Sequence, residues 1–200
     1  FIIYHNPAII LADGVIGQMM EKVVLPEQRT RLTDEEVIAR CPWATTGRTH
    51  HRTPNIITSL ELDPAEMEKR NIHLQKKYAE IEENEVRFEE LHCEDAEYLI
   101  VAFGSCARIA QKAMEIAREE GIKVGLLRPI TLWPFPSKAI AARAAQVKGI
   151  LTVELNAGQM VEDVRLAVEC KVPVEHFGRL GGIVPDPDEV ITALKEKLIK

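Results

Sequence analysis

Three short polar runs directly follow apolar segments of the sequence, and they begin at Gly104, Glu154 and Gly178. In an open α/β sheet, ligands bind beyond the carboxyl ends of the strands, so these positions are where chemistry is expected. The first run, Gly104-Ser105, leads into a predicted helix whose backbone amides could hold an anion. It lacks the GxGxxG and P-loop patterns, so a plain turn is the alternative interpretation.

The second and third runs offer a carboxylate, two amides and a guanidinium. Glu154, Asn156 and Gln159 belong to the run Glu-Leu-Asn-Ala-Gly-Gln-Met and could orient loops across the sheet edge. A single carboxylate is weak evidence for catalysis, which favours a structural or interface role. Arg179 lies in Gly-Arg-Leu-Gly-Gly and could meet a carboxylate or a phosphate. The glycines equally suit a simple turn.

The most unusual run is Arg-Pro-Ile-Thr-Leu-Trp-Pro-Phe-Pro, residues 128–136. Its three prolines predict a stiff, apolar loop at the end of a strand. Trp133 either plugs the core there or docks another subunit together with Arg128, because Trp and Arg are favoured anchors in interfaces. The sequence leaves both interpretations open.

No catalytic or metal-binding constellation can be read from the sequence. The cysteines form no CxxC cluster that could hold zinc or an iron–sulfur cluster within this chain; they are Cys41, Cys93, Cys106 and Cys170. His50 and His51 are adjacent and would point apart in an extended chain. The motifs HExxH and GxSxG are absent.

Composition indicates an ordinary globular protein. The 200 residues include 25 Lys and Arg against 31 Asp and Glu, a formal charge of −6, and 46% are hydrophobic. Net acidity without a basic stripe argues against a nucleic-acid partner. No apolar run approaches the length of about 18–20 residues that spans a bilayer. Because the spaced cysteines suggest free thiols rather than disulfides, we expect a reducing cytoplasm.

Apolar runs and amphipathic segments alternate regularly after residue 95. This alternation predicts an α/β fold with a mainly parallel sheet and helices on both faces. The expected strands are 98–103, 124–127, 150–154 and 173–177. The expected helices are 108–120, 137–147, 158–169 and 187–199.

The first 95 residues are less regular. Residues 7–12 predict a strand buried on both faces, followed by a helix over 15–23 that Asp13 could cap. Residues 26–60 predict an irregular loop, in which Thr33 starts one helical turn. Residues 64–91 predict one long helix, capped by Asp63, that is either solvated or a strut against a neighbour. We expect the chain to be the C-terminal part of something longer.

Several runs, taken together and in order, are similar to one known family. They are Asp-Gly-Val-Ile-Gly-Gln-Met-Met-Glu at 13–21, Thr46-Gly47, Ala-Phe-Gly-Ser at 102–105, and the two runs at 128–136 and 154–160. The chain resembles the alpha subunit of the 2-oxoacid:ferredoxin oxidoreductases, in the group that handles branched-chain 2-oxoacids or 2-oxoglutarate.

The resemblance implies a reaction for an assembly. The family converts a 2-oxoacid and coenzyme A to acyl-CoA and carbon dioxide, using thiamine diphosphate with Mg, and passes electrons through iron–sulfur clusters to ferredoxin. It implies that residues 1–25 end a pyrimidine-binding thiamine domain and that 26–95 form a linker loop and a long helix. It also implies that 96–200 form a transketolase C-terminal-like domain.

The resemblance places the cofactor-activating residues upstream of Phe1 and the clusters on partner subunits. It therefore implies no catalytic residue, metal ligand or cofactor held by this chain alone. Thr46, Gly47 and His50 are candidates for a substrate loop, although Arg48 beside them departs from the family pattern. The interface or anion candidates are Asp13, Gly14, Gly104, Ser105, Arg128, Trp133, Glu154, Asn156, Gln159 and Arg179.

Two other function classes stay open at this point. One is a beta-type subunit of a lipoamide-linked 2-oxoacid dehydrogenase, which uses the same C-terminal domain. The other is a non-catalytic α/β binding module with an anion site at Gly104-Ser105.

Overall fold

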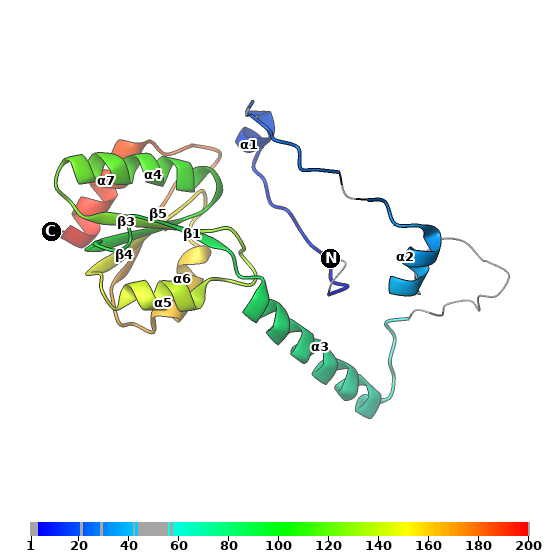
Figure 1. Ribbon diagram of the computed structural model, residues 1–200. Helices are drawn as coiled ribbons and strands as arrows, with labels where there is room; N and C mark the ends of the chain where they lie inside the picture. Colours follow the sequence, from blue (N-terminus) through cyan, green and yellow to red (C-terminus); the bar gives the residue numbers. More distant parts are fainter. Residues whose placement is uncertain are drawn as a thin grey trace. The chain divides into compact units, whose positions relative to one another are not determined.

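The computed structural model in Figure 1 describes residues 4–20, 22–28, 30–41, 43, 56 and 58–199. Contacts between residues divide the chain into two compact units, one of which is Met20–Leu74 and the other the remaining residues. Within the described ranges, no helix combines the length and the apolar character needed to cross a bilayer.

A five-stranded sheet forms the centre of the larger unit. Its strand order is β1-β3-β2-β4-β5, with β1 antiparallel to β3 and the other pairs parallel. Ile100 of β2 lies beside Leu126 of β3 and Leu151 of β4. The strands are β1 (Phe88–Leu91), β2 (Tyr98–Ala102), β3 (Val124–Pro129), β4 (Gly149–Glu154) and β5 (Val174–Gly178).

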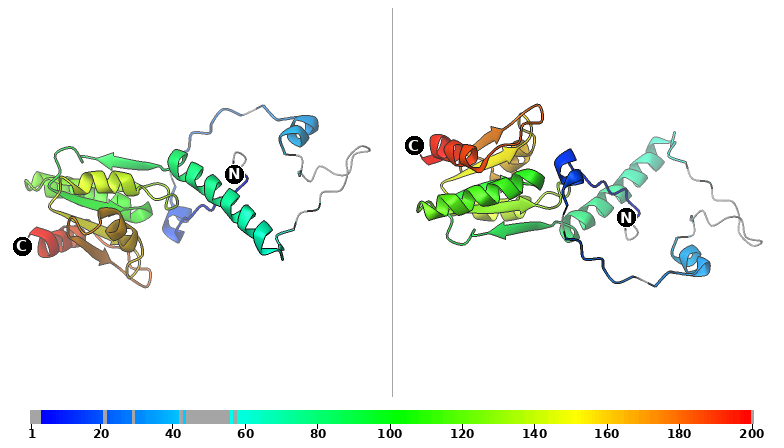
Figure 2. Two further views of the ribbon diagram at one scale, coloured as in Figure 1. Left: turned by 90° about the horizontal axis from the view of Figure 1, so that it is seen from below. Right: turned by 90° about the horizontal axis from the view of Figure 1, so that it is seen from above.

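Helices cover both faces of this sheet, as the views in Figures 1 and 2 agree. One face carries α4 (Gly104–Glu119) and α7 (Pro187–Leu194), and α7 continues as a π-helical turn, η1 (Lys195–Ile199). The other face carries α5 (Ser137–Ala144) and α6 (Met160–Val168). This arrangement confirms the predicted fold class.

Strand β2 shows why this sequence makes a sheet with two covered faces. Ile100 and Ala102 belong to the core under α4 and α7, while Leu99 and Val101 belong to the core under α5 and α6. Because successive side chains of a strand point to opposite faces, a strand covered on both sides must be apolar throughout.

The other helices of the described residues are α1 (Gly14–Gln18), α2 (Asp34–Arg40) and α3 (Pro64–Asn84). Asp63 caps α3 as predicted, because its carboxylate accepts the backbone N–H groups of Ala65 and Glu66 at 2.8 and 3.3 Å. Thr33 caps the start of α2 and forms a capping box with Glu36. The helix has about two turns, one more than the sequence predicts.

The predicted helix over 64–91 is wrong at its end. It stops at Asn84, and Phe88–Leu91 becomes β1, with Leu91 opposite Leu126. Pairing with the edge of β3 satisfies the backbone of this segment, and this tertiary context outweighs its local helical pattern. Helix α4 begins at Gly104, four residues before the predicted start, so the predicted turn is the first turn of the helix.

The predicted strand over 7–12 is also wrong. These residues pair with no strand of the described chain, and the following helix, α1, ends at Gln18 instead of residue 23. Asp13 does cap α1, as predicted. The substrate-loop candidates Thr46, Gly47 and His50 lie outside the described residues.

Candidate functional site

Glu154 ends β4 at the carboxyl edge of the sheet, and its side chain is only 1% exposed. Its Oε2 accepts the backbone N–H groups of Gln159 and Met160 at 3.1 and 2.8 Å, and its Oε1 accepts that of Val161 at 3.1 Å. The N–H groups at a helix start lack partners within the helix and attract negative charge. The carboxylate therefore occupies the anion-binding end of α6.

The loop between Glu154 and α6 is tightly held. Asn156 Oδ1 accepts the backbone N–H of Gly158 at 2.7 Å. On β5, a Cβ added to Gly178 would lie 2.2 Å from the backbone oxygen of Asn156, so only glycine fits there. The glycine at the end of β5 thus allows this loop to approach the neighbouring strand.

His176 of β5 joins the same cluster, and the sequence analysis missed it. Its Nδ1 lies 3.4 Å from Glu154 Oε1 and 3.2 Å from Thr152 Oγ1, and its Nε2 lies 3.3 Å from the backbone oxygen of Asn156. The signal was available in principle, since parallel register places His176 beside Thr152. Reading it required knowing that β4 and β5 are neighbours.

The start of α4 also faces a carboxylate. Ser105 Oγ donates to Asp13 Oδ2 at 2.7 Å, and Asp13 Oδ1 accepts the backbone N–H of Ile16 at 2.8 Å. The N–H of Ile16, and after it the hydroxyl of Ser105, lower the pKa of the Asp13 carboxyl. Asp13 therefore stays ionised beside the helix start.

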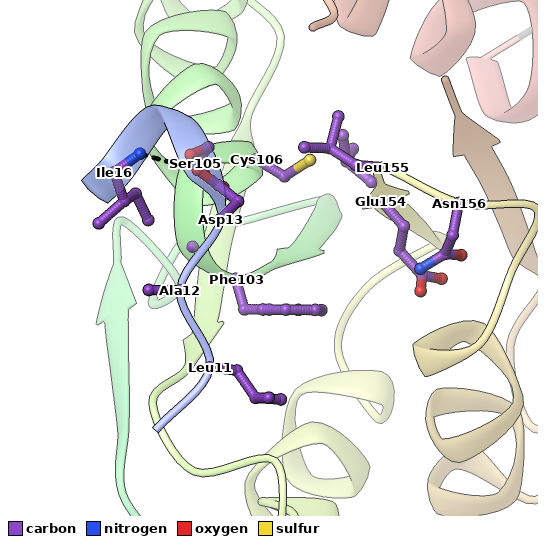
Figure 3. Close-up of a pocket in the computed structure, with 12 residues that line it drawn as sticks. Leu11, Ala12, Asp13, Ile16, Phe103, Ser105, Cys106, Glu154, Leu155 and Asn156 are labelled. Carbon is purple, nitrogen blue, oxygen red and sulfur yellow. Dashed lines mark hydrogen bonds between the residues drawn. The ribbon is translucent and has the colours of Figure 1, made fainter. Parts of the chain in front are cut away.

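A cavity of about 270 Å³ lies between these groups, as Figure 3 shows. Its wall is mostly apolar and includes Leu11, Phe103 and Leu155. It brings together five of the residues that the sequence singled out, namely Asp13, Gly104, Ser105, Glu154 and Asn156. Gly14 lies next to it as the first residue of α1.

Cys106 lines the cavity, but its thiol is expected to be unreactive. Burial, followed by the charges of Glu154 and Asp13, raises the pKa of the Cys106 thiol to about 11. The thiolate is the reactive form of cysteine, so this side chain is a poor nucleophile near neutral pH.

The other candidates are not in the cavity wall. Arg128 pairs with Glu89 at 3.1 Å, and Arg179 pairs with Glu189 at 3.2 Å. Trp133 packs edge-on against Tyr78 of α3, with ring centroids 5.7 Å apart, and half of its side chain stays exposed. Gln159 contributes its backbone N–H to Glu154.

The described residues do not fit a diphosphate, its metal ion or an iron–sulfur cluster. The helix starts that could hold phosphate face Glu154 and, through Ser105, Asp13. No three His, Cys, Asp or Glu side chains in the described part of the chain gather closely enough to hold a metal ion. Cys93 and Cys106 are buried in the separate cores on opposite faces of the sheet.

Residues 96–190 match the family model of the pyruvate:ferredoxin oxidoreductase core domain II. The chain is 44% identical over 193 residues to the ketoisovalerate oxidoreductase subunit VorB of Methanothermobacter marburgensis, covering 96% of this chain and 53% of VorB. It is 31% identical over 186 residues to the 2-oxoglutarate synthase subunit KorA of Archaeoglobus fulgidus, covering 92% of this chain and 51% of KorA. The chain therefore spans about half the length of these curated relatives.

A solved structure is similar as well. It is the 2-oxoglutarate:ferredoxin oxidoreductase from Magnetococcus marinus with 2-oxoglutarate, coenzyme A and succinyl-CoA bound. The likeness has a TM-score of 0.59 at 25% identity and covers 68% of this chain and 24% of that one. The chain is thus similar to subunits named ketoisovalerate oxidoreductase and 2-oxoglutarate synthase, and its residues 96–190 match the model of core domain II of the pyruvate:ferredoxin oxidoreductases.

Proposed function

We propose that this chain is the C-terminal part of the alpha subunit of a cytoplasmic 2-oxoacid:ferredoxin oxidoreductase. In this proposal the assembly converts a 2-oxoacid and coenzyme A to acyl-CoA and carbon dioxide, and the electrons pass to ferredoxin. The chain itself supplies no catalytic residue. It is a supporting part of a reaction centre that is built mainly from other domains and subunits.

The similarity to VorB carries this proposal. It extends over 193 residues and so includes most of residues 1–95, which the core-domain model does not match. Identity to VorB is 44%, against 31% to KorA. This difference supports a branched-chain 2-oxoacid over 2-oxoglutarate as the substrate of the assembly.

The carboxyl edge of the sheet supports a non-catalytic role. Glu154 and Asp13 of the chain itself face the helix starts where a phosphate would bind, and Cys106 is held as a thiol. Thiamine diphosphate, Mg and the iron–sulfur clusters are therefore assigned to a preceding domain and to partner subunits.

The domain assignment follows the same proposal. Residues 1–25 end the pyrimidine-binding domain, and 96–200 are a transketolase C-terminal-like domain. Residues 26–95 are a linker with a long helix, and the end of this segment adds the edge strand β1 to the sheet. Thr46, Gly47 and His50, in the linker, are the candidates for a substrate loop in this proposal. The half-exposed Trp133, held against Tyr78, faces a partner subunit.

The test is a substrate comparison on the tagged assembly that contains this chain. Coenzyme A-dependent reduction of a viologen dye is measured with 3-methyl-2-oxobutanoate, 2-oxoglutarate and pyruvate. We expect the branched-chain acid to have the highest kcat/KM, by about tenfold or more. An apolar pocket that accepts its branched side chain would disfavour the charged side chain of 2-oxoglutarate. The chain alone, with thiamine diphosphate and Mg added, is expected to reduce no dye.

Three other outcomes would contradict the proposed function or favour an alternative. Turnover by the chain alone would refute the supporting role. NAD reduction that depends on a lipoyl-bearing partner would favour the beta-type dehydrogenase subunit. Sub-millimolar nucleotide binding by the chain, measured by calorimetry and lost in Ser105→Ala, would favour the binding module.

A further inference from the structure

Helix α4 runs for 16 residues but begins without a side-chain cap of its own. Its N-cap residue is Phe103, whose side chain makes no hydrogen bond to the helix. Helices α2 and α7, in contrast, begin with capping boxes. The first N–H groups of a helix lack acceptors within it and carry partial positive charge. Negative charge from another part of the chain would therefore stabilise the start of α4.

Asp13 brings this charge from 92 positions earlier in the sequence. Ser105, the second residue of α4, donates its hydroxyl to Asp13 Oδ2 at 2.7 Å. The other carboxylate oxygen, Oδ1, accepts the backbone N–H of Ile16 at 2.8 Å and caps α1. Figure 3 shows the two side chains together at the start of α4. One carboxylate thus serves the starts of two helices, α1 directly and α4 through Ser105.

We propose that Asp13 and Ser105 are a positioning pair that joins the preceding thiamine-binding domain to the domain of residues 96–200. The inference rests on the proposed function, which assigns Asp13 to the end of the first domain and Ser105 to the second. Neither side chain touches substrate. Their bond sets where residues 7–18 lie on the carboxyl edge of the sheet, and so how the preceding domain meets that edge.

Packing contributes little to holding this segment. Residues 7–12 form no ladder with a strand of the described chain, and Ile9 and Ile10 are almost fully exposed. Helix α1 buries none of its residues. Asp13 and Ser105 nevertheless belong to the same compact unit of the chain. The bond between them therefore has a large share in fixing the segment.

The bond is of a strong kind. Its acceptor is ionised, because the N–H of Ile16 and then the hydroxyl of Ser105 lower the pKa of the Asp13 carboxyl. A hydrogen bond to a charged group is shorter and stronger than a neutral one. Ser105 is only 9% exposed, so little water competes for its hydroxyl. Because rates fall steeply when reacting groups are misplaced by about 1 Å, such a joint affects turnover without touching the reactants.

The first experiment uses the tagged assembly that contains this chain, with the 2-oxoacid that it converts fastest. In Ser105→Ala, kcat is expected to fall at least about threefold while KM stays within about twofold, because no substrate contact is lost. Ser105→Thr keeps the hydroxyl and is expected to restore most of the parent kcat. The matched control Lys195→Ala removes a 2.6 Å bond to Glu120 and is expected to keep the parent kcat.

A double-mutant cycle shows whether the two residues act as a pair. Asp13→Ala is expected to lower kcat at least as much as Ser105→Ala, because it also removes the cap of α1. In the Asp13→Ala background, Ser105→Ala is expected to have no further effect.

The second experiment uses the 200-residue chain and needs no turnover. Backbone order parameters of residues 13–18 are measured by nuclear magnetic resonance relaxation. They are expected to lie near about 0.85, the rigid range, in the parent chain and to fall toward about 0.6 in Ser105→Ala. Ser105→Thr and Lys195→Ala are expected to keep the parent values.

Unchanged kcat in Ser105→Ala, a fall that Ser105→Thr does not restore, or additive effects in the cycle would overturn the positioning pair. Order parameters that stay the same in Ser105→Ala would also overturn it. If Asp13→Ala fails to fold, the comparison of Ser105→Ala with Ser105→Thr decides. If the parent assembly converts none of the three 2-oxoacids, the proposed function fails instead, and the relaxation data alone decide whether the pair holds the segment.

Discussion

Residues 7–12 and 98–103 are both six-residue apolar runs, yet they have opposite environments. In the first run, Pro-Ala-Ile-Ile-Leu-Ala, Ile9 is 84% and Ile10 is 93% exposed, and the backbone forms no ladder. In the second, Tyr-Leu-Ile-Val-Ala-Phe, Leu99 and Val101 are completely buried at the centre of the sheet. The sequence predicts a buried strand in both places.

The difference teaches that an apolar run becomes a strand only where partners exist. β2 has β3 on one side, β4 on the other, and a helical layer on each face. Residues 7–12 have no partner strand in the described chain. Under the proposed function, the missing partners belong to a preceding thiamine-binding domain.

The largest expected effect compares equivalent substitutions in the two runs. Leu99→Ala opens a cavity in a full core and should lower the free energy of unfolding by about 2–5 kcal/mol. Ile10→Ala removes an exposed side chain and should change it by less than about 0.5 kcal/mol. Urea denaturation of the 200-residue chain measures both. Equal effects would mean that residues 7–12 are buried in solution.

The next effect concerns the cysteine that follows β2. Burial raises the pKa of the Cys106 thiol to about 11, while Cys170 is exposed at the end of α6. Iodoacetamide should therefore modify Cys170 at least about 100-fold faster than Cys106 at neutral pH. Mass spectrometry of timed digests gives both rates. A fast Cys106 would show that α4 opens from the sheet.

A smaller effect is expected at the edge strand β1, which the sequence assigned to a helix. Arg143 of α5 holds Glu90 of β1 through Nε–Oε1 at 2.9 Å and Nη2–Oε2 at 2.6 Å. Arg143→Ala should lower the free energy of unfolding by about 1–2 kcal/mol, between the values for exposed and buried pairs. Arg128→Ala, which breaks the more exposed pair with Glu89, is the control and should cost less.

The same pair predicts how acid affects stability. The Arg143 guanidinium lowers the pKa of the Glu90 carboxyl. The pair therefore contributes stability above the ordinary pKa of a glutamate, and this contribution is lost as the pH falls through the lowered value. Arg143→Ala should make stability depend less on pH in this acidic range. An unchanged acid limb in thermal unfolding would contradict this assignment.

The smallest effect is expected at the contact between Asp13 and Ser105, which lie shortly after the two compared runs. Ser105→Ala removes the hydrogen bond to Asp13 and should cost about 0.5–1 kcal/mol. The pKa of Asp13 should rise toward its ordinary value but stay below it, because the N–H of Ile16 remains. Carboxyl resonances measured against pH follow this change. A constant Asp13 pKa would show that the two residues do not meet in solution.

Much of the fold could be predicted from sequence after residue 95. The parallel strands and covering helices were predicted because each apolar run is short, bounded by glycine or proline, and separated by amphipathic segments. Strand β1 could not be predicted, since four residues of Phe-Glu-Glu-Leu carry too little pattern to compete with the preceding helix. This segment becomes a strand because it pairs with the edge of β3.

The site divides in the same way. Strand-end reasoning selected Glu154, Asn156 and Ser105, because the carboxyl ends of parallel strands share one edge. It could not tell that Glu154 binds the start of α6 instead of a ligand, since that depends on where three backbone N–H groups point. His176 escaped notice because its partners come from a neighbouring strand.

The sequence by itself determined which segments are apolar on two faces, which residues end them, and the family to which these runs are similar. Only the tertiary structure decided which apolar run is buried and which carboxylates face the helix starts. The physical reason is that local pattern specifies what a segment can do, whereas hydrogen-bond partners and neighbouring charges come from residues far along the chain.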